Sequence, residues 1–205
     1  PPRSTLFPYT TLFRSLINLQ GCSLVPTPEP LVTYQLTAAT SKSPSLTSLP
    51  TSLRINKPNA SGYLTTNRLL VANEQNQLSL YKGAQWNEVT PLLIRNHLLD
   101  SFRQANLFSF VSNDDKRLMA EVELDSDLRT LQIEYDHPQP KVVIHLVARL
   151  VDANSKKILT TKSFSQTLSS PSNELNTVVA TLNQAQNLLA ESIIEWSYEH
   201  LSQQN

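Results

Sequence analysis

The residue with the most distinctive chemistry is Cys22, the only cysteine in a chain of 205 residues. One thiol cannot form an internal disulfide or a multi-thiolate metal site, so its chemistry must be that of a single nucleophilic sulfur. Cys22 follows Leu19, Gln20 and Gly21, and a proline-rich stretch ending at Pro30 comes after it. A small residue before the cysteine lets a peptidase reach the scissile bond. The thiol can then accept a diacylglyceryl group through a thioether.

The segment Leu19-Gln20-Gly21-Cys22 resembles the lipobox of exported lipoproteins, although Gln20 replaces the small or apolar residue that is usual there. A lipidated Cys22 would carry three acyl chains, more than the two signals that stable membrane anchoring needs. The alternative is a buried cysteine that packs as a small hydrophobe. Its place between a short apolar stretch and a proline-rich tether argues against burial, so we expect Cys22 to be the lipid-attachment site.

Four segments follow from this reading. Residues 1–15 resemble translated adapter sequence, and we expect a non-native leader there that takes no part in the fold. Residues 16–21 are interpreted as a truncated signal peptide with the lipobox, and residues 22–31 as the lipid anchor and tether. Residues 32–205 are enough for one folded domain with a sizeable core.

Composition argues against a nucleic-acid partner and against a transmembrane helix. Lys and Arg number 17, as do Asp and Glu, so no basic surface for nucleic acid is indicated. No stretch reaches the roughly 18 apolar residues that a transmembrane helix requires. Any contact with a membrane should therefore use a lipid anchor or a surface of the protein.

The sequence lacks the common motifs for nucleophilic catalysis and for nucleotide binding. No serine lies in a Gly-x-Ser-x-Gly sequence, and no glycine-rich phosphate loop occurs. His97 and Asp100 are three residues apart and could share a metal, but one such pair without further ligands is typical of a solvated helix face. We expect no catalytic residues, metal or cofactor, and a periplasmic hydrolase is the least favoured hypothesis.

Periodicity predicts an α+β domain in which a mostly antiparallel sheet is covered on one face by two amphipathic helices. A helix is expected from Thr90, with Pro91 in its first turn, to Asn106, and a second from Pro171 to about Ser202. The strands are expected at 33–36, 52–56, 68–72, 77–82, 107–111, 118–124, 128–135, 142–151 and 157–167. Turn residues between the last four, including Asp125-Ser126-Asp127, favour an antiparallel meander.

Four aromatic residues are candidates for partner or ligand contact. Tyr81 and Trp86 precede the first helix, and Trp196 and Tyr198 lie where the second helix is expected to outrun the sheet. Each also has a structural interpretation, because large aromatic side chains commonly anchor a core.

The order of segments resembles the ABC-type transport auxiliary lipoprotein family, which includes the paraquat-inducible protein C group. The residues that carry the resemblance follow the lipobox in order: Ser61-Gly62-Tyr63-Leu64, Arg68 to Val71, Leu78 to Tyr81, Gln85-Trp86, the helix Pro91 to Asn106, and Leu107-Phe108. The resemblance covers about Cys22 to Gln203.

This resemblance implies an outer-membrane lipoprotein that faces the periplasm. Its partners would be a permease, an ATPase and a mammalian-cell-entry-type protein, in a system that transports lipids. The leading hypothesis is thus an auxiliary subunit that acts by protein contact, with a homo-oligomer left open. The alternative is a lipid-binding carrier that shields an acyl chain in an apolar pocket lined by residues such as Phe102, Phe108, Phe110 and Trp196.

Overall fold

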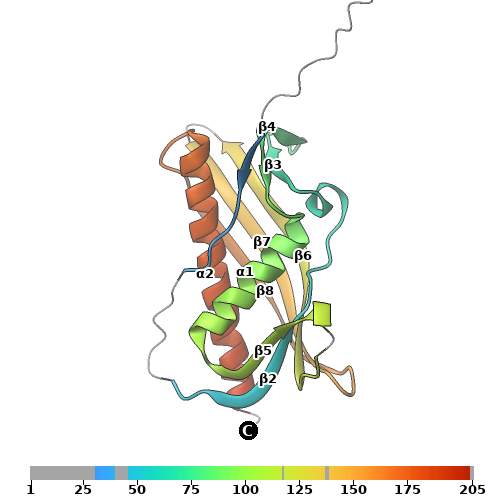
Figure 1. Ribbon diagram of the computed structural model, residues 1–205. Helices are drawn as coiled ribbons and strands as arrows, with labels where there is room; N and C mark the ends of the chain where they lie inside the picture. Colours follow the sequence, from blue (N-terminus) through green and yellow to red (C-terminus); the bar gives the residue numbers. More distant parts are fainter. Residues whose placement is uncertain (1–30, 40–45, 117, 137–138, 204–205) are drawn as a thin grey trace, which may run out of the picture.

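The computed structural model describes residues 31–39, 46–116, 118–136 and 139–203. Within these segments a single mixed sheet of eight strands carries two helices on one face (Figure 1). The strands are β1 (Val32–Tyr34), β2 (Leu49–Ile55), β3 (Arg68–Ala72), β4 (Leu78–Trp86), β5 (Phe108–Asn113), β6 (Val122–Asp136), β7 (Gln139–Asp152) and β8 (Ile158–Ser169). The helices are α1 (Thr90–Ala105) and α2 (Leu175–Ser202), with short 3-10 turns η1 (Gly62–Thr65) and η2 (Asp114–Lys116). Cys22 and the predicted leader, signal peptide and most of the tether lie outside the described residues.

Strand β6 organises the sheet. On one side it pairs antiparallel with β7 along its whole length, and β7 pairs antiparallel with β8. On the other side the first half of β6 pairs with β2 and the second half with β3, both in parallel. Strand β5 extends the sheet beyond β2, while β4 and β1 extend it beyond β3.

The predicted α+β class, with two helices over one face, is confirmed, but the predicted mostly antiparallel sheet is wrong. Four of the strand pairings are parallel, namely β1–β4, β2–β5, β2–β6 and β3–β6. Strands that are consecutive in the chain and pair with each other, β3–β4, β6–β7 and β7–β8, are antiparallel and joined by short turns. Each parallel pair joins strands that are separated in the chain by other elements, and such long connections allow parallel pairing.

The expected break at Asp125-Ser126-Asp127 is also wrong, because β6 runs through these residues. Ser126 is buried and pairs with Ala148. The carboxylates of Asp125 and Asp127 point the other way, where Asn56 and Arg149 donate hydrogen bonds to them. Cross-strand partners thus satisfy residues that would otherwise favour a turn.

The first helix lies where the sequence predicted it. The second begins at Leu175, four residues after the predicted start at Pro171. Pro91 occupies the first turn of α1, but the Thr90 hydroxyl donates to the carbonyl of Thr66 at 2.7 Å and does not cap the helix. Asn106 ends α1 in the left-handed conformation, with φ at 53°, which asparagine tolerates better than most residues.

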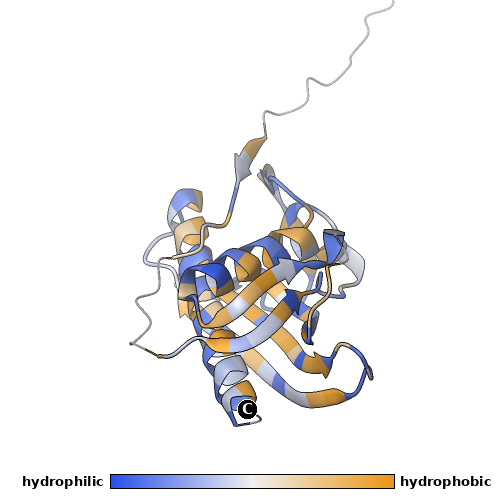
Figure 2. Ribbon diagram, turned by 60° about the horizontal axis from the view of Figure 1, so that its bottom comes forward, coloured by the Kyte–Doolittle hydropathy of each residue, from blue (hydrophilic) through white to orange (hydrophobic). Residues whose placement is uncertain are grey.

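The core lies between the helices and the sheet. Leu98 of α1 and Leu182 of α2 are buried, in keeping with the amphipathic character expected of both helices. Hydrophilic and hydrophobic residues alternate along the long strands in Figure 2, so one face of the sheet packs on the helices and the other meets solvent. None of the described helices combines the length and the apolar character needed to cross a membrane.

Candidate interaction surface

Two of the four aromatic candidates belong to the core. Trp86, at the end of β4, is 1% exposed, and Trp196 of α2 is 8% exposed. Trp196 packs edge to face on Phe164 of β8, with ring centroids 5.4 Å apart. This contact joins the last turns of α2 to the outermost strand.

The two tyrosines are only partly buried. Tyr81 of β4 packs against the core, and its carbonyl accepts a hydrogen bond from Arg68 at 2.9 Å. The hydroxyl of Tyr198 donates to the carbonyl of Thr47 at 2.9 Å. Leu201, one turn further along α2, is buried, so the end of this helix stays against the core. The structure therefore separates the four candidates into one pair on β4 and one pair on α2.

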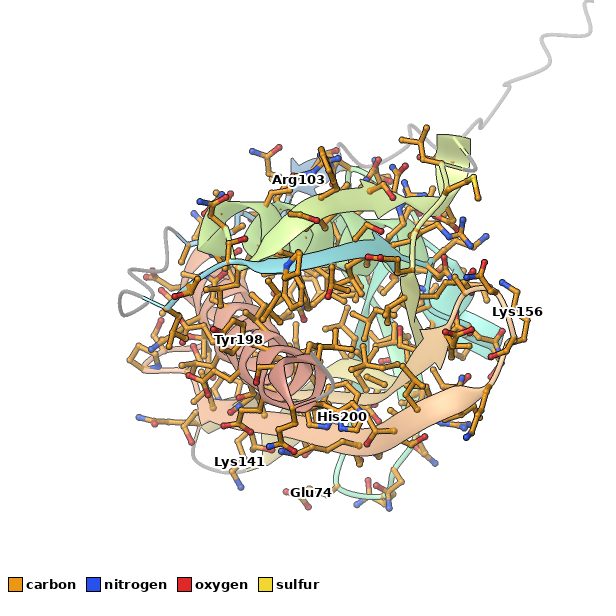
Figure 3. The ribbon with its side chains drawn as sticks, turned by 90° about the horizontal axis from the view of Figure 1, so that it is seen from below. Glu74, Arg103, Lys141, Lys156, Tyr198 and His200 are labelled. Atoms are coloured by element: carbon orange, nitrogen blue, oxygen red, sulfur yellow. The ribbon has the colours of Figure 1, made fainter. Side chains whose placement is uncertain are left out.

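An exposed apolar surface lies elsewhere, at the end of the sheet where β6 begins. Phe110, Leu118 and Met119, which we call the apolar patch, are 75%, 54% and 94% exposed. Phe110 and Met119 border an open groove of about 350 Å³, together with residues of β2 and the turn between β7 and β8. That turn carries Lys156, which lies across this end of the molecule from Tyr198 in Figure 3.

Strand register explains why Phe110 is exposed. The register between β2 and β5 shifts after Leu49, so that Ser52 pairs with Phe110 and Leu53 pairs with Val111. Leu53 is buried beneath the helices, so Phe110 points to the opposite face. Sequence reasoning missed the patch because residues 107–111 and 118–124 were read as strands without knowledge of their register. Large apolar side chains gathered at the surface are typical of binding sites.

Charged side chains fix the base of the patch. The Glu123 carboxylate is almost fully buried and receives hydrogen bonds from Arg54 and Lys156, the latter at 2.6 Å. Arg54 also donates to the carbonyl of Leu118 at 2.9 Å, which ties the patch to β2. Burial alone would raise the pKa of Glu123, but the hydrogen bonds from Lys156 and Arg54 lower it below its usual range.

A second ion cluster holds the chain that leaves β5 toward the patch. Arg95 of α1 is buried and donates to Asp114 and Asp115 of η2 at 2.8 and 2.6 Å. Burial of Asp114 would raise its pKa, but the hydrogen bond from Arg95 lowers it. Ion pairs thus position both sides of the apolar patch, whose residues are free to contact a partner.

Two histidines, His97 and His145, have structural partners. The Nε2 atom of His97 lies 2.9 Å from Asn187, and that of His145 lies 2.8 Å from Ser163. Across the described ranges, no three His, Cys, Asp or Glu side chains gather as they would around a metal ion.

The aromatic residues suggested for an acyl-chain pocket lie in different environments. Phe102 and Phe108 are buried against each other with ring centroids 5.8 Å apart, Trp196 packs on Phe164, and Phe110 faces solvent. These residues give the lipid-carrier hypothesis no support.

Comparison with known proteins identifies the family. The chain belongs to the ABC-type transport auxiliary lipoprotein component family, whose model matches residues 34–194. This confirms the resemblance seen in the sequence. The family consists of lipoproteins associated with ABC transport and is not a known enzyme family. Its lipoprotein character indicates a location in the bacterial envelope.

Individual relatives add the fold but no activity. Protein XCC0632 from Xanthomonas campestris has a similar structure, with a TM-score of 0.78 and 20% identity over 84% of this chain and 98% of its own. A second, uncharacterized protein of known structure has a TM-score of 0.64 and 16% identity over 82% of this chain and 98% of its own. An uncharacterized protein of Bradyrhizobium diazoefficiens is 29% identical over 131 residues, which are 64% of this chain and 35% of that protein. The chain therefore spans about a third of the length of that relative.

Proposed function

We propose that this protein is the auxiliary subunit of an ABC-type lipid transport system of the mammalian-cell-entry type. It is anchored to the outer membrane through Cys22, faces the periplasm and works by protein contact. Its partners are the permease, the ATPase and the mammalian-cell-entry-type protein. The family match supports the association with an ABC transporter, and the lipobox-like residues before Cys22 support the anchor.

The observation that carries contact as the mode of action is the apolar patch. Phe110 and Met119 expose large apolar side chains, and the neighbouring Leu118 accepts at its carbonyl a hydrogen bond from Arg54 of the Arg54–Glu123–Lys156 cluster. Burying such side chains against a partner gives about 25 cal/mol for each Å² of apolar surface removed from water. A rigid base lowers the entropic cost of ordering them on binding.

The contact hypothesis is tested by copurification from a host that expresses the whole transport system. Replacing Phe110 and Met119 together by Ser should reduce recovery of the permease, the ATPase and the mammalian-cell-entry-type protein by at least tenfold. Leu78→Ser is the matched control, because Leu78 is also exposed but pairs with Ala72 near the far end of β6. Equal recovery with the double variant and the control would refute the role of the patch.

The anchor is tested separately. The natural full-length protein, expressed with its own leader, should incorporate labelled palmitate, and Cys22→Ser should abolish the incorporation. Label that persists in Cys22→Ser, or fails to enter the unaltered protein, would remove the basis for membrane anchoring at this residue.

A further inference from the structure

The segment that follows β1 lies along α2 and is held by side chains of that helix (Figure 1). Three asparagines of α2 accept hydrogen bonds from Tyr34, the last residue of β1, and from this segment. The pairs are Tyr34 Oη with Asn176 at 2.7 Å, the Thr37 amide with Asn183 at 2.7 Å, and the Ala39 amide with Asn187 at 3.0 Å. We call residues 35–39 the strap and these three asparagines the asparagine stripe.

The spacing of the stripe fits an extended chain. Asn176, Asn183 and Asn187 are separated by seven and four residues, which places them on one face of a helix. At a rise of about 1.5 Å per residue these intervals span about 10.5 and 6 Å along α2. Three and two residues of extended chain, at about 3.3 Å each, span about 10 and 6.6 Å. The interval between the two backbone donors, Thr37 and Ala39, therefore matches the interval between Asn183 and Asn187, while Tyr34 reaches Asn176 through its side chain.

Recognition at two of the three points uses the main chain. Asn183 and Asn187 accept from the backbone N–H groups of Thr37 and Ala39, whose side chains are exposed. Every residue except proline carries such a donor. The stripe therefore selects extended backbone conformation and is indifferent to side chains at these positions.

The strap also closes the line of contact between α1 and α2, which we call the helix seam. Ala39 borders a very small cavity there, together with Ser101 of α1 and Ala190 and Ile194 of α2. The same Oδ1 atom of Asn187 that binds the Ala39 amide lies 2.9 Å from His97 of α1. One asparagine thus joins the strap to both helices.

We propose that the asparagine stripe is a binding site for an extended peptide backbone, occupied by the chain's own strap as a releasable cover over the helix seam. The strap opens without unfolding of the sheet, because its contacts with α2 are separate from the strand pairing of β6, β7 and β8. The three paired residues of β1 keep its first end in place while it opens.

Amide hydrogen exchange on the full chain tests the proposal at Asn183, which accepts from Thr37. Asn183→Leu keeps the volume but removes the acceptor, and it should accelerate exchange of the Thr37 amide at least tenfold. Asn183→Asp keeps an acceptor oxygen and should leave that rate within about threefold of the original. The amide of Leu146, in the middle of β7, reports on the sheet and should be unaffected by either change.

Unchanged exchange at Thr37 in Asn183→Leu, or equal acceleration in the Leu and Asp variants, would overturn the proposal. Acceleration at Leu146 as large as at Thr37 would also overturn it, because the asparagine would then support the whole fold.

Two proline variants test whether the asparagine stripe recognises the main chain of the strap. Ala39→Pro removes the N–H that Asn187 binds. Ala38→Pro leaves both bound N–H groups in place, and it favours the extended conformation at Thr37. Ala39→Pro should accelerate Thr37 exchange at least fivefold more than Ala38→Pro, and equal effects would contradict recognition through backbone donors.

Discussion

His97 of α1 and Asn187 of α2 face each other across the helix seam, with the His97 Nε2 atom 2.9 Å from the Asn187 Oδ1 atom. His97 is buried, and its Nδ1 atom has no hydrogen-bond partner among the described residues. Because Asn187 Oδ1 can only accept, Nε2 must carry the proton of the neutral ring. The histidine thus donates to the same oxygen that binds the strap.

Acid should weaken the fold through this histidine. Burial lowers the pKa of His97 below its ordinary value of 6.5, and the hydrogen bond to Asn187 only partly opposes the effect. The folded state therefore favours the neutral ring, so its contribution is complete above about pH 6.5 and is lost as the pH falls below it. The loss is at most about 1.4 kcal/mol per pH unit. Urea unfolding at pH 7.5 and 5.5 should show a smaller fall in stability for His97→Gln than for the unaltered protein, and equal falls would contradict this assignment.

The two aromatic candidates on α2 should differ strongly in their effect on stability. Trp196→Ala removes a buried ring that packs on Phe164, and we expect it to cost about 3–5 kcal/mol. Tyr198→Phe removes only the hydrogen bond to Thr47, which should cost about 1 kcal/mol or less. Chemical denaturation measures both. Similar stabilities for the two variants would show that Trp196 is not a core residue.

The ion cluster beneath the apolar patch should depend on Glu123 more than on Lys156. The Glu123 side chain is 7% exposed and forms ion pairs with both Arg54 and Lys156, whereas the Lys156 side chain is 62% exposed. Glu123→Gln should therefore cost about 3 kcal/mol, and Lys156→Ala less than about 1 kcal/mol. Because the folded pKa of Glu123 is depressed, its contribution is present above about pH 4.5 and is lost as the pH falls further. An unfolding series from pH 7 to 3 checks both points, and a costlier Lys156→Ala would reverse the interpretation.

Gln186 offers a way to stabilise the protein. Its side chain is fully buried in α2, and neither its Oε1 nor its Nε2 atom has a hydrogen-bond partner among the described residues. A buried amide left unpaired costs about 1–3 kcal/mol, and methionine has a similar length and volume without the polar group. Gln186→Met should raise the free energy of unfolding by about 1–2 kcal/mol. A loss of stability would mean that the amide has a partner, such as a buried water.

Local patterns predicted the helices and most strands. Helical periodicity follows from the residues themselves, as the apolar repeat of Ile94, Leu98 and Phe102 in α1 illustrates. Turn-forming residues from Asn73 to Asn76 likewise separate the strands expected at 68–72 and 77–82, and the pairing of Ala72 with Leu78 joins them as the β3–β4 hairpin. At Asp125 and Asp127 local preference failed, because their partners are distant in the chain: Asn56 follows β2 directly, and Arg149 lies in β7.

By itself, the sequence determined the family, the α+β class and the helices over one face, since these depend on segment order and periodicity. Only the tertiary structure decided that β2 and β3 join β6 in parallel, because strand direction is not encoded in alternation. It also decided that Trp86 is buried while Phe110 is exposed, because the register of each strand sets which face a side chain occupies. The asparagine stripe could not be predicted from the sequence either. The spacing of residues 176, 183 and 187 is functional only because a segment from the other end of the domain lies beside them.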